Sequence, residues 1–271
     1  MANLRRRFGR GLTFAILSVV AVVMLYPFYF MLQVSLRSQS QYVTKSGFSL
    51  DSWAGLFDVL PVGQQLLNST IVTLSALAII LVVSTMGGFA FAKLRYSGRT
   101  FVLLAIVGGM MIPLQSIIIP EYVNIAQAGL VNKFEGAILV YAALGAPFAT
   151  FLMTTYFRGV PSELIEASII DGASYFQVFR RVMLPLAKPA IVTVAVLQFI
   201  QIWDDLLIGL LFLQYPDVRT ITVGLATLQS SRVINIPVLM AGSLVSALPA
   251  VIVYLIFQRY LIAGLTMGMR K

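Results

Sequence analysis

The chain of 271 residues is 59% hydrophobic and only 11% charged, and it carries a formal net charge of +9 at pH 7. Soluble domains contain about 25% charged residues, so this composition excludes an ordinary soluble enzyme. The sequence has no cysteine and no histidine, which excludes disulfides, thiol nucleophiles, zinc sites with the usual ligands and imidazole acid–base catalysis.

Six apolar segments are long enough to cross a membrane as helices. A transmembrane helix needs about 20 predominantly apolar residues, because the hydrocarbon core offers no water to exposed backbone groups. The segments cover residues 12–36, 68–92, 100–119, 136–157, 190–213 and 238–258. The sequence therefore predicts an all-α, polytopic membrane protein with six transmembrane helices and no separate soluble domain.

The first apolar segment follows a basic stretch that includes Arg5 and Arg10, as the core of a signal peptide does. The apolar run continues to Leu36, however, whereas a signal core has about 7–15 residues and a cleavage site of small residues. We therefore expect this helix to be retained. Residues 1–66 are assigned to the first transmembrane helix and the first extracytoplasmic loop.

Positive charges are unevenly distributed over the polar segments. With the N-terminus in the cytoplasm, most of the Lys and Arg residues lie inside, namely Arg5, Arg6, Arg7, Arg10, Lys93, Arg95, Arg99, Arg158, Arg180, Arg181, Lys188, Arg259, Arg270 and Lys271. The outside loops then hold Arg37, Lys45, Lys133, Arg219 and Arg232. This bias indicates that both termini are cytoplasmic, and it accounts for the net charge without a nucleic-acid partner.

The cytoplasmic segment 163–189 has the pattern of two short amphipathic helices. Ser162 suits the N-cap of the first helix, and Glu163 and Glu166 suit its first turn, where the helix dipole favours negative charge. The apolar residues expected to share one face of this helix are Ile165, Ile169 and Ile170.

A turn at Asp171-Gly172 is predicted to separate the two helices, because glycine tolerates backbone conformations that other residues resist. The second helix is predicted to begin near Tyr175 and to stop at Leu184-Pro185, since proline interrupts helical hydrogen bonding. Its apolar residues are Phe176, Phe179, Val182 and Met183. The pattern of apolar residues is equally compatible with two structures. One is a hairpin that rests on lipid headgroups, and the other is a rigid lever that contacts a cytoplasmic partner.

The spacing within this segment is more specific than its amphipathicity. Glu166-Ala167-Ser168 is followed after three residues by Gly172, and after nine more by Val182-Met183-Leu184-Pro185. This pattern resembles the EAA loop of bacterial ABC importer permeases, from which Ser168 and Val182 depart conservatively. The resemblance implies a type I importer permease fold, with a permease core over residues 67–262 and a cytoplasmic tail over residues 263–271.

By the same resemblance, the EAA loop docks on an ATP-binding subunit and transmits movement to the helix bundle. The residues carried over to that contact are Glu166, Ala167, Ser168, Asp171, Gly172, Ala173, Phe176, Val182, Leu184 and Pro185. The sequence has no Gly-Lys pair, and therefore no phosphate-binding loop of the Walker type. We expect a non-catalytic chain without a cofactor or metal of its own, and ATP and Mg on two separate ATP-binding subunits.

Three further stretches resemble permeases of the carbohydrate-uptake class, of the maltose and glycerol-phosphate type. They are residues 128–132, residues 219–229 and the tail 264–271, which departs from the usual family tail at Met267, Met269 and Arg270. The resemblance implies the second permease of a heterodimeric pair in a bacterial cell membrane. It also implies a sugar or sugar derivative as the solute, delivered by an extracytoplasmic solute-binding protein.

The fifth apolar segment contains Trp203-Asp204-Asp205, where the family usually has Asn in place of Asp204. In a straight helix from Ala190, Asp204 lies roughly 21 Å along the axis, and a carboxylate at such depth is costly unless it meets water or a polar partner. Carboxylates and amides can bond to sugar hydroxyls, and an indole can stack on a sugar ring. The residues predicted to line a sugar pathway are therefore Gln198, Gln201, Trp203, Asp204 and Asp205.

Three alternatives remain open for this segment and for the chain as a whole. The carboxylates could merely pin a bent helix or pair with the partner permease. In an ion-coupled secondary transporter, Asp204 and Asp205 would form a proton or sodium site. A third alternative is a permease of the same importer class for a non-sugar solute.

Overall fold

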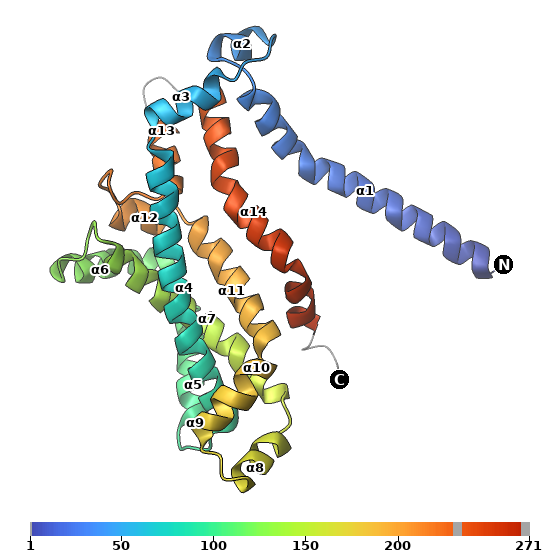
Figure 1. Cartoon of the computed structure of the whole chain (residues 1–271), viewed down its shortest axis with the longest axis vertical. Helices are drawn as coiled ribbons and strands as arrows, with labels where there is room; N and C mark the ends of the chain where they lie inside the picture. The colour runs from blue at the N-terminus through green and yellow to red at the C-terminus, as the bar shows by residue number, and fades with distance from the viewer. Residues whose placement is uncertain (1, 230–234, 267–271) are drawn as a thin grey trace. The chain divides into compact units, whose positions relative to one another are not determined.

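The computed structural model describes residues 2–229 and 235–266, and every regular element in those ranges is helical (Figure 1). The longest helices are α1 (Ala2–Ser35), α4 (Val62–Lys93), α7 (Phe134–Gly159) and α14 (Ile236–Thr266). Each of these four contains a stretch long and apolar enough to cross a membrane. The shorter helices are α2 (Gln39–Thr44), α3 (Asp51–Val59), α5 (Arg99–Gly109), α6 (Leu114–Gln127), α8 (Glu163–Ile170), α9 (Tyr175–Val178), the π-helical turn η1 (Phe179–Met183), α10 (Leu184–Leu186), α11 (Lys188–Trp203), α12 (Leu207–Phe212) and α13 (Ile221–Gln229).

The chain divides into two compact units, which are described separately. The first comprises residues 1–62 and 225–247, and the second comprises residues 63–224 and 248–271. The final residues 267–271 of the predicted tail, including Met267, Met269 and Arg270, lie outside the described ranges, as does Arg232. The predicted boundaries at residues 66 and 262 remain predictions.

In the first unit, α1 is one continuous helix whose span Thr13–Ser35 is exposed over most of its length, with Val34 and Ser35 buried at its end, as expected of a lipid-facing helix. The predicted outside segment that follows is structured. Ser38 and Gln41 form a reciprocal capping box at the start of α2, which satisfies two of the free N–H groups there. The hydroxyl of Ser52, in α3, donates to the carbonyl oxygen of Arg37 and ties this segment together.

The predicted third membrane helix, residues 100–119, is not continuous. α5 ends at Gly109, α6 begins at Leu114, and their axes differ by 97°. Pro113, in extended conformation at φ −65° and ψ 135°, directly precedes α6. Its ring would clash with the carbonyl four residues back, that of Gly109, so a straight helix through this position is disfavoured. The prediction of an unbroken span was wrong here.

The predicted fifth membrane helix, residues 190–213, is also broken. α11 ends at Trp203, residues 204–206 form a connection, and α12 follows from Leu207. Asp204 therefore lies at the C-cap of α11 rather than inside a helix. At its other end α11 meets the helical stretch Tyr175–Leu186 at an angle of 73° (Figure 1).

The core of the second unit lies around α7, which packs against α5, α11 and α12. Phe89 of α4 contacts Phe157 of α7 edge to face, with ring centroids 6.1 Å apart, and Phe179 of η1 at 5.3 Å. Gly88 allows α4 to approach α7 closely, because a Cβ at position 88 would lie 2.6 Å from the Cβ of Met153. These contacts join the predicted cytoplasmic segment to the long helices.

Polar contacts from α4 fasten the segment before α13, including those of Gln64, Asn68 and Ser69. The side-chain amide of Asn68 donates to the carbonyl oxygens of Asp217 and Arg219, both at 2.9 Å. The hydroxyl of Ser69 accepts from the N–H of Ile221, the first residue of α13, at 3.0 Å. Residues 217–221 are therefore held by specific polar contacts, even though most of them belong to no helix.

Candidate functional sites

The first candidate site is the hairpin formed by α8, the turn at Gly172 and α9, which the sequence predicted to be cytoplasmic. α8 begins directly after Ser162, as predicted, and the carbonyl oxygen of Ser162 accepts from the N–H groups of Ile165 and Glu166. The side chain of Ser162 does not cap the helix, contrary to the prediction. Its hydroxyl lies 3.4 Å from the ammonium nitrogen of Lys93 instead.

The turn has the geometry that the Asp171-Gly172 pair predicted. Gly172 has a φ of +87°, and its N–H donates to the carbonyl oxygen of Ile169. The next N–H, of Ala173, donates to the carbonyl oxygen of Ser168 at 3.0 Å, which closes the end of α8. A Cβ at position 172 would meet nothing within 4 Å, so glycine is favoured here by backbone conformation alone.

The second helix begins at Tyr175, as predicted, behind a capping box. The hydroxyl of Ser174 accepts from the N–H of Gln177, and the Gln177 side chain accepts from the N–H of Ser174. The helix does not stop at Pro185, however, but continues to Leu186. The N–H of Leu184 donates to the carbonyl oxygen of Phe179, five residues back, and this wider π turn accommodates the proline ring.

The two faces of the hairpin differ in their contacts. Ile165, Val178 and Met183 are buried against the unit, while Ile170 is 85% exposed and Phe176 is 63% exposed. The expectation that Ile165, Ile169 and Ile170 share one apolar face was wrong, because Ile165 alone of the three is buried. Large exposed apolar side chains beside the acidic residues Glu166 and Asp171 are typical of a surface that contacts another protein or a membrane.

The residues predicted to contact an ATP-binding subunit lie mostly on the outer side of this hairpin. Those that are exposed are Glu166, Ala167, Asp171, Gly172, Phe176 and Pro185. Ser168, Ala173, Val182 and Leu184 are half-buried, and the last three pack against the hydrophobic core of the unit. The outer set is therefore available for contact, whereas Val182 and Leu184 fix the hairpin to the bundle.

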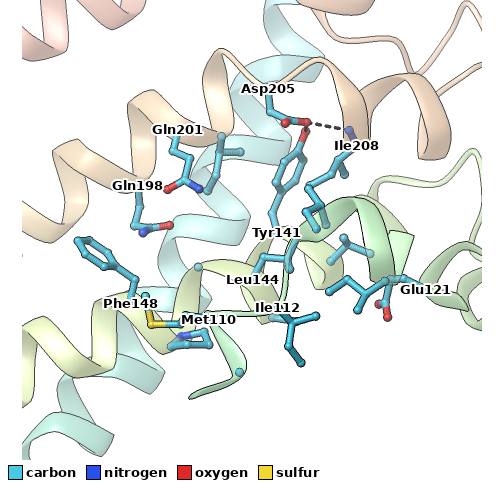
Figure 2. Close-up of a pocket in the computed structure, with 18 of the residues that line it drawn as sticks. Met110, Ile112, Glu121, Tyr141, Leu144, Phe148, Gln198, Gln201, Asp205 and Ile208 are labelled. Carbon is cyan, nitrogen blue, oxygen red and sulfur yellow. Dashed lines mark hydrogen bonds between the residues drawn. The ribbon is translucent and has the colours of Figure 1, made fainter. Parts of the chain in front are cut away.

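The second candidate site is a cavity of about 700 Å³ next to the two helix breaks (Figure 2). It is lined by Met110, Ile112 and Pro113 of the α5–α6 break, by residues of α7, and by Gln198, Gln201 and Asp205 at and near the α11–α12 break. The α7 residues of its wall include Tyr141, Leu144, Pro147 and Phe148. Both breaks thus expose backbone and side chains at a hollow, where irregular structure within a membrane protein is tolerated.

One carboxylate oxygen of Asp205, Oδ1, accepts two hydrogen bonds at the break between α11 and α12. Its carboxylate accepts from the phenol of Tyr141 at 3.0 Å and from the N–H of Ile208, in α12, at 2.8 Å. Its carbonyl oxygen accepts from the hydroxyl of Thr222 at 3.1 Å. Asp205 therefore caps α12, joins it to α7 and lines the cavity at the same time (Figure 2).

Three of the five residues predicted for a solute pathway come together at this cavity: Gln198, Gln201 and Asp205. Trp203 is buried and stacks on Phe199, with ring centroids 5.4 Å apart and an interplanar angle of 12°. Asp204 is exposed, and like Trp203 it is not part of the cavity wall. Their predicted place in the pathway is not supported by this cavity.

The sequence reasoning missed Tyr141, Phe148 and Glu121, which also line the cavity (Figure 2). Nothing local distinguishes Tyr141 from other aromatic residues in apolar helices. The Gly-Gly pair 108–109 followed by Pro113 is a signal of the α5–α6 break, and recognising it would have indicated a hollow at this depth.

Comparison with known proteins places this architecture in a family. A family model described as "Binding-protein-dependent transport system inner membrane component" matches residues 1–266. The diacetylchitobiose uptake system permease protein NgcG of Streptomyces coelicolor is 31% identical over 275 residues, covering 98% of this chain and 90% of that protein. The arabinooligosaccharides transport system permease protein AraQ of Halalkalibacterium halodurans is 36% identical, covering 74% of this chain and 71% of that protein.

The fold agrees with this assignment. A chain from the crystal structure of a bacterial ABC transporter involved in alginate import superimposes with a TM-score of 0.81 at 23% identity. The match covers 94% of this chain and 96% of that chain. The all-helical, six-segment plan with two bent segments is thus the type I importer permease fold. The chain belongs to the family of inner membrane components of binding-protein-dependent transport systems.

Proposed function

We propose that this chain forms one half of the translocation pathway of an ATP-driven importer for a sugar or sugar derivative. The observation that carries the proposal is the cavity beside the two helix breaks, in a member of a binding-protein-dependent permease family. The substrate class is supported by relatives whose names specify diacetylchitobiose and arabinooligosaccharides.

The lining of the cavity suits a neutral, hydroxyl-rich solute. The amides of Gln198 and Gln201 can donate to and accept from hydroxyl groups, while Phe148 and Leu144 offer apolar surface to the C–H faces of a sugar ring. The carboxylate of Asp205 is already bonded to Tyr141 and to the Ile208 N–H. These two bonds to one oxygen support a structural role for Asp205. The amides of Gln198 and Gln201 and the relatives named for carbohydrates favour a sugar over a proton or sodium ion.

ATP hydrolysis is proposed to occur on two separate ATP-binding subunits, which hold ATP and Mg and dock on the α8–α9 hairpin. The outer residues Ile170 and Phe176 provide the apolar part of that contact, and Glu166 and Asp171 the charged part. The hairpin suits a lever, because a capping box starts α9 and hydrogen bonds close the turn at Gly172.

The remaining partners follow from the same reading. A second, homologous permease completes the pathway, and an extracytoplasmic solute-binding protein delivers the sugar to residues 37–66 and 214–237. Both termini lie in the cytoplasm of a bacterial cell, on the side where ATP is available, as the Lys and Arg distribution indicates. Closure of the ATP-binding dimer pushes the hairpin and opens the cavity to the outside.

Purification of the tagged chain from its native host in mild detergent tests this assembly. We expect recovery of an ATPase with a Walker motif, of a second permease and of a binding protein that retains a carbohydrate. If the recovered binding protein retains an amino acid or peptide, the solute of the importer is not a sugar. Recovery of a stable homodimer without any ATPase would overturn the proposal and favour an ion-coupled transporter.

A further inference from the structure

One lysine connects the predicted cytoplasmic hairpin to a helix far away in the sequence. Lys93 is the last residue of α4, and its ammonium group donates to the carbonyl oxygen of Val160 at 2.5 Å. Val160 is the C-cap of α7. The same nitrogen lies 3.4 Å from the hydroxyl of Ser162, the residue before α8, so one side chain spans the α7–α8 junction.

The end of α7 and the start of α8 each present a group that attracts the ammonium group of Lys93. The C-terminal carbonyls of α7 form the negative end of the helix, and an ammonium group bound to them completes their hydrogen bonding. The carboxylate of Glu163, in the first turn of α8, attracts the same ammonium group. Lys93 is therefore held by α7 and α8 together.

The neighbouring cations differ from Lys93 in this respect. Arg99 donates to the carbonyl oxygen of Leu94, five residues away within its own turn. Arg95 is exposed. Both line the same cytoplasmic cleft as Lys93, so the accumulation of positive charge on the inside does not by itself explain the contact that Lys93 makes.

The position of Lys93 matters because α8 has few other attachments. Its outer residues are exposed, and Ile165 is its one buried residue. The link from α7 to α8 passes through Val160, which is extended at φ −76° and ψ 131°. An extended link absorbs displacement, whereas a side chain bonded across it transmits displacement directly to α4.

We propose that Lys93 is a positioning residue that transmits movement of α8 to α4, and thereby couples ATP hydrolysis to opening of the pathway. This inference rests on the proposed function. It assigns to α4 a direct mechanical connection with the hairpin, besides the covalent connections of α8 to α7 and, through α9, to α11.

The test measures ATP hydrolysed per sugar transported, using the complete complex in proteoliposomes with its binding protein. In Lys93→Met we expect ATP hydrolysis within twofold of the original complex and uptake reduced at least fivefold, so that the ratio rises. Lys93→Arg, which keeps a cationic donor, should restore the ratio to within twofold. Arg95→Gln, in the same cleft, is the matched control and should leave the ratio unchanged.

If the complex without any substitution shows no ATP-dependent uptake, the proposed function itself is contradicted. A coupled original complex together with an unchanged ratio in Lys93→Met would contradict only the role of Lys93. A fall of hydrolysis and uptake in parallel would also contradict it, because that result describes loss of assembly rather than loss of coupling. If the complex with Lys93→Met does not assemble, the measurement is repeated with Lys93→Gln, which keeps a polar side chain. The same results then support or contradict the role of Lys93.

Discussion

The phenol of Tyr141 in α7 donates a 3.0 Å hydrogen bond to the carboxylate of Asp205, 64 residues later, at the break between α11 and α12. The same carboxylate accepts from the N–H of Ile208 and so starts α12. One acidic side chain therefore determines where α11 and α12 separate and how α12 meets α7. This arrangement favours a structural carboxylate over an ion-binding one.

Substitutions of Asp205 distinguish a structural role of its carboxylate from a role in ion binding. Asp205→Ala leaves the Tyr141 hydroxyl and the Ile208 N–H without their acceptor, and an unsatisfied buried group costs about 1–3 kcal/mol. We expect a lower melting temperature in detergent for Asp205→Ala, and a value close to the original for Asp205→Asn, whose amide oxygen still accepts. Asp205→Asn should also retain ATP-driven uptake. Complete loss of uptake in a stable Asp205→Asn complex would instead indicate a titrating carboxylate in transport.

Gly172 is the position at which backbone conformation most directly affects the proposed lever. Its φ of +87° costs a residue with a Cβ about 1–2 kcal/mol, although the space around it is open. We expect Gly172→Val to keep the chain in the membrane and to reduce uptake several-fold more than ATP hydrolysis. Gly159→Val is a matched control, since a Cβ there also meets nothing within 4 Å and no positive φ is required. Equal effects of the two substitutions would contradict a specific role of the turn.

The exposed apolar residues of the hairpin are expected to form the contact with the ATP-binding subunit. Ile170 is 85% exposed, so Ile170→Ser should leave folding intact and reduce the amount of ATPase that co-purifies at least fivefold. Ile165, in the same helix, is 6% exposed, and Ile165→Ser should lower the thermal stability of the chain itself. Unchanged ATPase recovery with Ile170→Ser would place the contact elsewhere.

The cavity should tolerate no large side chain if it carries the solute. Ala143 of α7 lines the cavity, and Ala143→Trp should reduce uptake at least fivefold while ATP hydrolysis persists. Leu139→Trp, one turn earlier in α7, is the control, because Leu139 is 50% exposed and is not part of the cavity wall. Normal uptake with Ala143→Trp would exclude this cavity from the pathway.

The sequence predicted the helical class, the positions of the apolar segments and the hairpin with its turn. These features depend on local composition and on glycine or capping residues, which act within a few positions of where they stand. The α9 start at Tyr175 and the turn at Gly172 were predicted for that reason. The apolar residues of α8 were assigned less well, because Ile165 and Ile170 are five positions apart and point in different directions on a helix.

The break at Pro113 was not predicted, because average hydropathy over a segment is insensitive to a single proline. A bent helix at Asp204 and Asp205 was one of the alternatives left open, and hydropathy could not select it. The composition of residues 100–119 and 190–213 is apolar enough for a span, and only the hydrogen bonding of individual residues interrupts it. Contacts such as Tyr141 with Asp205 and Lys93 with Val160 join residues more than 60 positions apart. No local pattern in a single sequence specifies such pairs.

In the proposed importer, ATP drives uptake of the solute through this chain and its partners. The most direct measurement is uptake of a labelled oligosaccharide into proteoliposomes that contain the purified complex, with the loaded binding protein outside and ATP with Mg inside. We expect accumulation that requires ATP and the binding protein and needs no ion gradient. Accumulation without ATP, driven by a proton or sodium gradient, would contradict it.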